Sequence, residues 1–375
     1  MRLVVFGLTI SSSWGNGHAT LWRGLCRALA RRGHSVVFYE RDLPFYAPHR
    51  DLAEIPNGRL VLFSGWDEIR ERAARDVAQA DVAMVTSYCP DALAATDLVL
   101  NGRALRVFYD LDTPVTLDRL RRGEAVEYVG PDGFRGFDLV LSYTGGPALA
   151  ALCDDLGAAR AAPLYGHVDP EVHRPAAAEA HYAADLSYLG TYAADRQAKV
   201  LSCLVEPARR RPDRRFLIGG AQYPPDFPWT DNIFFVRHLA PQEHPAFYAS
   251  SRLTLNVTRA AMAAMGWCPS GRLFEATACG AALLSDAFDG LDAFYRPGED
   301  ILLAETPDAV LAALDRGDAA LRRIAEAGRA RTLAAHTSAH RAAELEALLE
   351  SARTPIARTP LTRPSVTRPS VTLEA

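Results

Sequence analysis

The sequence that decides the fold reads Pro269-Ser270-Gly271-Arg272-Leu273-Phe274-Glu275-Ala276-Thr277-Ala278-Cys279-Gly280, and the short apolar run Ala282–Ser285 follows it. The polar and glycine residues at its start predict a helix over Arg272–Cys279. The small residues in its second half allow that helix to pack closely on a neighbour. Because a helix here leads directly into a buried strand, the segment is typical of an α/β fold with a parallel sheet.

Apolar runs and helical patterns alternate through the first half of the chain. The stretch Ala19–Arg32 has apolar residues at helical spacing, and Gly33 stands where a glycine ends a helix. The expected strands are Leu3–Phe6, Val36–Tyr39, Leu60–Phe63, Val82–Thr86, Leu105–Tyr109, Leu139–Ser142 and Pro163–Tyr165. This alternation predicts parallel strands that are joined by crossover helices.

A second series begins after the Ala-rich connector Ala176–Ala184. Its expected strands are Leu186–Leu189, Phe216–Ile218, Ile233–Val236, Leu253–Val257, Ala282–Ser285 and Ile301–Ala304. Its expected helices are Arg196–Arg211, Gln242–Ser251, Arg272–Cys279, Ala309–Arg316 and Ser338–Glu350. We therefore expect an α/β protein of two tandem Rossmann-like, doubly wound domains. The predicted divisions are residues 1–168, 183–335, a C-terminal helix over 336–351, and a disordered Arg/Pro repeat tail over 352–375.

The composition agrees with two soluble domains in 375 residues, with 49% hydrophobic and 23% charged residues. A net charge of −4 argues against non-specific nucleic-acid binding, so no nucleic-acid partner is expected. We expect no transmembrane segment, because no apolar run is long enough to span a bilayer. The six cysteines include no C-x-x-C pair and mostly stand in apolar runs, which indicates free thiols in a reducing, cytoplasmic setting.

The first candidate site is the loop Gly15-Asn16-Gly17-His18, between the first strand and the first helix. Gly15 and Gly17 let the backbone approach a ligand closely. His18 either faces the cleft at the carboxyl end of the sheet or only caps the helix. A dinucleotide site is the weaker interpretation, because the loop is not G-x-G-x-x-G and Glu40, which ends the second strand, lacks the usual context.

The second candidate is Asp110-Leu111-Asp112, directly after the strand Leu105–Tyr109. Asp-x-Asp holds a divalent metal in nucleotide-sugar enzymes of another fold, but no other acidic cluster completes a metal shell here. We expect one carboxylate to line an acceptor cleft and no metal site. The alternative is that an aspartate caps the turn before Pro114.

Two further segments suit an anionic ligand. Gly190-Thr191 follows a strand and precedes a helix that carries Arg196 and Lys199. This arrangement suits a diphosphate. The alternative is that it is only a solvated helix start. The start of the helix at Ser270–Arg272 offers free backbone N–H groups to an anion. Glu275, one turn inside, can accept two hydrogen bonds from vicinal hydroxyls such as those of a ribose; otherwise it is an ordinary helix acid.

Residues 272–280 and 284–286 resemble the donor-site segment of GT-B fold glycosyltransferases of group 1, in particular the branch of CgeB-like spore-maturation proteins. Residues 295–303 are similar to the segment that follows it in that family. Residues 163–169 resemble the end of the family's N-terminal domain, and residues 15–18 resemble its first loop. The resemblance covers about residues 1–350.

The resemblance implies that residues 1–168 bind an acceptor and residues 183–335 bind a nucleotide-sugar donor, and that the last helix crosses back onto the N-terminal domain. Glu275 would hold the ribose, the segment 236–239 would border the base, and the arginines would face the diphosphate. The expected donor-binding residues are Gly15, Gly17, Gly190, Thr191, Arg196, Arg237, His238, Leu239, Arg259, Ser270, Gly271, Arg272, Leu273 and Glu275. No cofactor is expected besides the co-substrate, a UDP-, GDP- or dTDP-linked sugar, and the acceptor is open.

The expected activity is metal-independent glycosyl transfer, of the hexosyltransferase kind. If the reaction inverts, His18 is the expected general base, with Asp110 or Asp112 next. If it retains configuration, these residues position the acceptor. Many retaining members carry a glutamate where this chain has Trp267, so the stereochemistry stays open. The alternatives are a nucleotide-sugar epimerase and an inactive scaffold that binds partners through the Arg/Pro tail.

Overall fold

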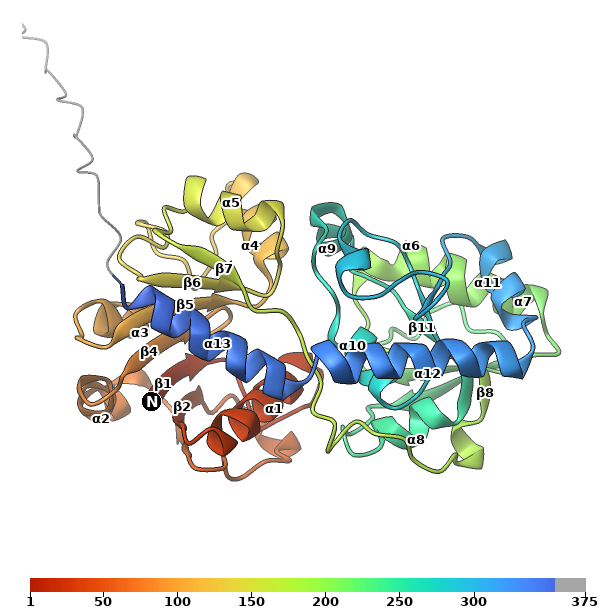
Figure 1. The fold of residues 1–375 in the computed structure, drawn as a ribbon, viewed down its shortest axis with the longest axis horizontal. Helices are drawn as coiled ribbons and strands as arrows, with labels where there is room; N and C mark the ends of the chain where they lie inside the picture. Colours follow the sequence, from red (N-terminus) through yellow and green to blue (C-terminus); the bar gives the residue numbers. More distant parts are fainter. Residues whose placement is uncertain (355–375) are drawn as a thin grey trace, which may run out of the picture.

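The computed structural model describes residues 1–354, and these form two separate parallel sheets that lie side by side (Figure 1). The first sheet has seven strands in the order β3-β2-β1-β4-β5-β6-β7. Its strands are β1 (Arg2–Gly7), β2 (Ser35–Arg41), β3 (Arg59–Phe63), β4 (Val82–Thr86), β5 (Leu105–Asp110), β6 (Leu139–Ser142) and β7 (Ala161–Pro163). The strand order reverses beside β1, and loops at this point of a parallel sheet form ligand crevices.

Helices cover both faces of the first sheet because its strands are apolar on both sides. One face packs against α1 and, from the far end of the chain, α13; the other packs against α2, α3 and α5. The helices of this half are α1 (Gly17–Arg31), α2 (Trp66–Ala78), α3 (Ala92–Leu100), α4 (Thr113–Arg121) and α5 (Pro147–Asp154). The predicted end of the first helix is confirmed, because Gly33 follows it with a φ of +81°.

The second sheet has six strands in the order β10-β9-β8-β11-β12-β13. They are β8 (Ala184–Leu189), β9 (Phe216–Gly220), β10 (Ile233–Arg237), β11 (Ser251–Asn256), β12 (Leu283–Ser285) and β13 (Leu302–Leu303). The helices of this half are α6 (Gln197–Val200), α7 (Glu206–Arg210), α8 (His244–Ala249), α9 (Ala260–Met265), α10 (Gly271–Ala278), α11 (Pro307–Leu314) and α12 (Asp318–Ala335), and α13 (Ser338–Ala352) follows them. Helices α8 and α10 pack on one face, while α7, α11 and α12 pack on the other.

The chain passes between the two sheets twice, and the two passages are hydrogen-bonded to each other. The backbone N–H of Val168 donates to the carbonyl of His336 at 3.0 Å, and that of Ser338 donates to the carbonyl of Val168 at 2.8 Å. Gly24 of α1 lies against this junction, where a Cβ atom would stand 2.5 Å from the Oγ of Ser338. Helix α13 therefore leaves the second sheet at this point and packs along α1 (Figure 1).

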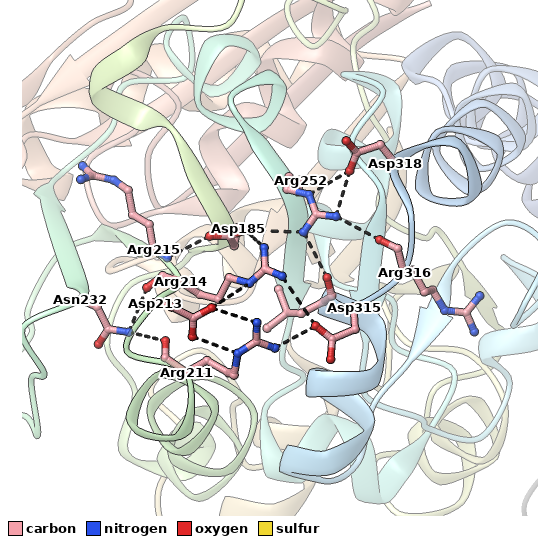
Figure 2. A network of polar contacts seen from close by, with 11 residues as sticks. Asp185, Arg211, Asp213, Arg214, Arg215, Asn232, Arg252, Asp315, Arg316 and Asp318 are labelled. Carbon is pink, nitrogen blue, oxygen red and sulfur yellow. Dashed lines mark hydrogen bonds and ion pairs between the residues drawn. The ribbon is translucent and has the colours of Figure 1, made fainter.

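A polar network joins the elements at the amino-terminal ends of the second set of strands (Figure 2). Asp185, near the start of β8, accepts hydrogen bonds from the Nη1 of Arg214 and the backbone N–H of Arg215, each at 2.9 Å. Arg252, near the start of β11, donates to the Oδ1 of Asp318 at 2.9 Å. This network lies at the end of the sheet opposite to the carboxyl ends of the strands, so it supports the fold and leaves the other end for a ligand.

Four details differ from the pattern in the sequence. The expected helix 196–211 is interrupted by a π-helical turn over Leu201–Val205, which ends two residues before Pro207, a residue that cannot donate a backbone hydrogen bond. Strand β7 ends at Pro163, two residues before the expected end. Helices α9 and α12 have no counterpart among the expected elements. The expected disordered tail begins too early, because Ala352 closes α13, and the rest of that tail from residue 355 lies outside the described residues.

Within residues 1–354, no helix is both long enough and apolar enough to cross a membrane.

Candidate active site between the two sheets

A cavity of about 370 Å³ lies where the carboxyl ends of the two sets of strands face each other. The loops after β1 and β5 line one side of it, and the loops after β8, β9, β10 and β11 line the other, together with the start of α10. Parallel strands present their following loops and helix starts at this edge, so both halves of the chain contribute polar groups to one space.

On the side of the first sheet, His18 and Asp112 lie together. The Nε2 of His18 is 4.0 Å from the Oδ1 of Asp112, whose other oxygen accepts a hydrogen bond from the hydroxyl of Tyr88 at 2.8 Å. Asn16 caps α1 by accepting from the backbone N–H of His18 at 3.0 Å, which fixes the position of the imidazole on the first helical turn. The arrangement is a basic ring beside a carboxylate that is 10% exposed, both of them at the cavity wall.

Asp110 differs from Asp112 in both position and environment. Its side chain is fully buried, lies outside the cavity lining, and accepts a hydrogen bond from the backbone N–H of Asp112 at 3.1 Å. Burial raises the pKa of Asp110 to about 6. The two carboxylates therefore do not converge on one point: Asp110 supports the turn, and Asp112 faces the cavity.

On the side of the second sheet, Arg272 is held in place at the start of α10. Its Nε donates to the carbonyl of Leu189, its Nη1 donates to the Oδ1 of Asn256 at 2.7 Å, and its guanidinium lies over the ring of Tyr188 at 4.9 Å. A Cβ atom at Gly190 would lie 2.8 Å from the Nη2 of Arg272. The glycine thus lets the guanidinium and the free N–H groups of α10 share one concave surface, which suits an anion.

The other cations of this side divide into two groups. Arg196 and Arg259 line the cavity; the Nη1 of Arg196 donates to the hydroxyl of Tyr188 at 3.2 Å, and Arg259 pairs with Asp195 at 2.9 Å and approaches Asp112 at 3.9 Å. Lys199, by contrast, pairs with Glu305, and Arg237 at the end of β10 is exposed outside the cavity.

Glu275 lies in the cavity wall, one turn inside α10. Burial raises its pKa, while nearby His244 and Arg272 oppose that rise. The Nε2 of His173 is 4.0 Å from the Oε1 of Glu275, and the same nitrogen is 3.1 Å from the Nδ1 of His244. Burial lowers the pKa of His173 to about 3 and that of His244 to about 4, so both rings are neutral at pH 7.

Trp267 lies outside the cavity lining. Its ring packs between two glycines that carry positive φ angles, Gly146 from the first half of the chain and Gly290 from the second. Its carbonyl accepts a hydrogen bond from the backbone N–H of Gly145 at 3.0 Å. Trp267 therefore joins the two halves of the molecule and presents no acid to the cavity.

Glu40, the acid that would bind a ribose in a dinucleotide site, has its carboxylate occupied by the first loop. Its two oxygens accept hydrogen bonds from the side chains of Thr9 and Ser11 and from the backbone N–H groups of Ile10 and Ser11, at 2.5 to 3.0 Å. The residue is buried, so it holds the loop that carries Gly15–His18 in shape.

The structure brings most of the predicted site residues to one cavity. Those in its lining are His18, Asp112, Gly15, Gly17, Gly190, Thr191, Arg196, His238, Leu239, Arg259, Ser270, Gly271, Arg272 and Glu275. Asp110, Arg237 and Leu273 lie outside it, since Leu273 is in the core of the second half.

Sequence reasoning missed His173, Tyr88, His244 and Tyr248. Tyr88 closely follows strand β4, at the same edge as Asp112, so its position after a strand was a usable signal. His244 and Tyr248 lie one turn apart on α8, and both line the cavity. Nothing in the local pattern distinguishes them from ordinary helix residues.

Two comparisons of the sequence bear on this site. Residues 196–347 match the protein family described as glycosyl transferase-like. No curated protein sequence matches the chain significantly.

Solved structures with the same arrangement of two sheets include a sucrose-phosphate synthase and an alpha-glucosyltransferase. Sucrose-phosphate synthase from Thermosynechococcus elongatus superposes with a TM-score of 0.68 at 16% identity, over 94% of this chain and 99% of that one. The chain has the GT-B fold. Anabaena Alr3699/HepE, solved with UDP and glucose, superposes with a TM-score of 0.67 at 12% identity, over 94% of this chain and 100% of that one. An alpha-glucosyltransferase in complex with UDP and a 13-mer DNA gives 0.63 at 12% identity, over 93% and 99% of the two chains.

In the GT-B fold the cavity described above is the cleft between the two Rossmann-like sets of strands. The match to the glycosyl transferase-like family lies in the second half, which supplies Arg196, Arg259 and the α10 segment to the cleft. The first half supplies His18 and Asp112 from beyond the matched residues.

Proposed function

We propose that this protein transfers a sugar from a UDP-sugar to an acceptor hydroxyl, with inversion at the anomeric carbon and without a catalytic metal. The observation that carries the proposal is the polarity of the cleft. Three arginines and a helix start line the wall built by the second sheet, and the His18–Asp112 pair lines the opposite wall. An anionic donor and a hydroxyl that must lose a proton need these two environments side by side.

On the donor side, Glu275 accepts hydrogen bonds from the two ribose hydroxyls, and His238 and Leu239 border the base. Arg196, Arg259 and the first N–H groups of α10 hold the diphosphate, together with the loop at Gly190. These fixed charges and dipoles stabilise the negative charge that develops on the leaving diphosphate. Since this work is done by guanidinium groups and backbone, the reaction needs no divalent ion there.

On the acceptor side, the acceptor oxygen attacks the anomeric carbon as its proton passes to the Nε2 of His18. The bond between the anomeric carbon and the diphosphate oxygen breaks, and its electron pair leaves with UDP. Asp112 stabilises the imidazolium that forms, and Tyr88 holds the carboxylate in position. Two features support inversion. One is the pair of His18 and Asp112. The other is residue 267, where many retaining members of the resembled family carry a glutamate and this chain has a tryptophan that lies outside the cleft.

UDP is proposed as the nucleotide because Anabaena Alr3699/HepE was solved with UDP-glucose and the alpha-glucosyltransferase with UDP.

We also propose that the chain belongs to the CgeB-like branch, which is supported by the sequence of residues 272–286 and 295–303. We propose a cytoplasmic location, which is supported by six free cysteines, five of them buried.

Calorimetric titration with UDP, UDP-glucose, GDP and dTDP tests the donor site, using Arg196→Ala against the exposed Arg237→Ala as a matched control. Loss of one charged hydrogen-bonding partner, worth about 1.5–3 kcal/mol, should weaken UDP binding about 10–150-fold in the first variant and leave the control unchanged. Equal effects of the two substitutions would refute the donor placement. Binding without any release of UDP in the presence of candidate acceptors would favour a scaffold.

The anomeric configuration of the product, read from its proton NMR coupling constant, tests the stereochemistry. An inverted product agrees with the role of His18, and a retained one refutes it. Conversion of the UDP-sugar into an isomer with no acceptor present would identify an epimerase instead.

A further inference from the structure

Three side chains with metal-binding atoms meet at one wall of the cleft. His173 comes from the segment that connects the two sheets, His244 from the start of α8, and Glu275 from α10. The Nε2 of His173 lies 3.1 Å from the Nδ1 of His244 and 4.0 Å from the Oε1 of Glu275, and the three ligand atoms all lie within 4.8 Å of one another. Two imidazoles and one carboxylate form a common ligand set for zinc with an open fourth position.

The distances are close to those of an occupied site. Zinc bonds of about 2.0–2.1 Å at tetrahedral angles separate ligand atoms by about 3.3 Å. The two histidine nitrogens are already at that separation. The carboxylate oxygen of Glu275 would have to come about 0.7 Å closer to the Nε2 of His173, from 4.0 Å, and up to about 1.5 Å closer to the nitrogen of His244, from within 4.8 Å. Glu275 and His244 both face the cavity from which an ion would enter.

The hydrogen bonds around the cluster determine which nitrogen of each histidine faces its centre. The Nε2 of His244 lies 3.3 Å from the carbonyl oxygen of Leu239, which can only accept, so the proton is on Nε2 and the Nδ1 lone pair faces His173. Anchoring of this kind orients the ligating imidazole in zinc proteins. His173 itself is fully buried, and across residues 1–354 its Nδ1 finds no hydrogen-bond partner. With its Nε2 donating to His244, this ring has an unpaired Nδ1 lone pair, which can take up the proton when a metal occupies Nε2.

We propose that His173, His244 and Glu275 bind one divalent transition-metal ion such as Zn²⁺, and that this ion and the nucleoside diphosphate exclude one another. The metal replaces the hydrogen bond between the two histidines, and His173 then carries its proton on Nδ1. Imidazole nitrogens select zinc, cobalt, nickel or copper over magnesium and calcium. The exclusion rests on the proposed function, because it requires that Glu275 bind the ribose: one carboxylate cannot serve both ligands. The ion therefore inhibits the enzyme and takes no part in the transfer.

Calorimetry with Zn²⁺ alone, on the metal-stripped protein, tests the site. We expect one ion per chain, and a tetrahedral d–d absorption with Co²⁺ but no thiolate charge-transfer band. His244→Ala and Glu275→Gln should each weaken Zn²⁺ at least about tenfold. His181→Ala is the matched control, because this exposed histidine lies 3.5 Å from Glu179 and should leave binding unchanged. Melting temperatures of the metal-free variants verify that each is folded.

The inference is overturned if folded wild-type protein binds no stoichiometric Zn²⁺, if the control weakens binding as much as the cluster variants do, or if Co²⁺ gives a thiolate band. If the two ligands exclude one another, saturating UDP should lower the affinity for Zn²⁺ at least about tenfold, and saturating Zn²⁺ should lower the affinity for UDP by the same factor. Tight Zn²⁺ binding that UDP does not affect would overturn the exclusion. UDP binding to the metal-free protein tests the proposed function separately, so the two failures are distinguishable.

Discussion

Replacement of Asp112 by asparagine removes a charge from the centre of the cleft while keeping the shape of the side chain. The carboxylate lies 4.0 Å from the Nε2 of His18 and 3.9 Å from the Nη1 of Arg259. Two unit charges at 4.0 Å interact by about 4 kcal/mol at an effective dielectric constant of about 20. Since the side chain of His18 is 25% exposed and that of Asp112 is 10% exposed, we take about half of this value, about 2 kcal/mol.

This energy stabilises the imidazolium that exists only once His18 has taken the proton from the acceptor. A loss of about 2 kcal/mol should therefore lower kcat about 30-fold. The KM for the donor should stay the same or fall slightly, because Arg259 becomes freer to bind the diphosphate. His18→Ala should lower kcat by about 10²–10⁴-fold, with donor affinity within a few-fold of wild type.

The assay is the initial rate of UDP release at saturating donor and acceptor, with donor affinity measured by calorimetry. Asp118→Asn is the matched control. Among residues 1–354 this exposed aspartate on α4 forms an ion pair with Arg122 alone, and Arg122 lies on the surface, so the substitution should leave kcat unchanged. Since Asp112 acts through His18, the double variant should be no slower than His18→Ala alone. A kcat within threefold of wild type for Asp112→Asn, or rate losses that multiply in the double variant, would refute the reasoning.

Glu275→Gln keeps the shape of the side chain but weakens the hydrogen bonds to the ribose, so calorimetry should show donor binding about 10–150-fold weaker while kcat stays within a few-fold; normal donor binding would contradict the placement of the nucleotide. Excess chelator should leave the rate unchanged, or raise it where bound zinc inhibits; loss of activity that Mn²⁺ or Mg²⁺ restores would contradict metal independence. Burial raises the pKa of Asp110 from 3.8 to about 6, so the folded state holds this proton more tightly than the unfolded state does, and ionisation costs stability as pH rises from about 4 to about 6. In urea unfolding, the free energy of unfolding of Asp110→Asn relative to wild type should therefore rise by up to about 3 kcal/mol between pH 4 and pH 7. A difference that does not change with pH would contradict the raised pKa.

The strands were the easiest part of the fold to predict. The expected bounds of β4 and β6 coincide with the observed ones, because each is a short run of buried residues between clear helical or turn signals. Helix α12 was missed although it is 18 residues long. It buries a narrow set of residues that includes Leu321, Ile324 and Gly328, and the many Ala and Arg residues between them hide the helical period.

The site was predictable where it depends on one local segment and not where it depends on contacts between segments. The pattern at Ser270–Arg272 marks a helix start, and a helix start carries its own N–H groups wherever the helix lies. The difference between Asp110 and Asp112 has no such local sign. Asp110 ends β5 and Asp112 lies two residues beyond it, and only the packing around them buries the first completely and leaves the second in the wall of the cleft.

The sequence by itself determined that this chain builds two parallel sheets and places polar loops after their strands, because the alternation of apolar runs and helices leaves few other ways to bury its apolar residues. Only the tertiary structure decided which of those loops face each other. Asp112 meets His18 and Arg259, and Glu275 meets His173 and His244, across separations along the chain that no local pattern encodes. The contact of Asp112 with Arg259 also depends on how the two sheets sit together, which the paired crossings at Val168 and Ser338 and the packing of α13 on α1 fix in space.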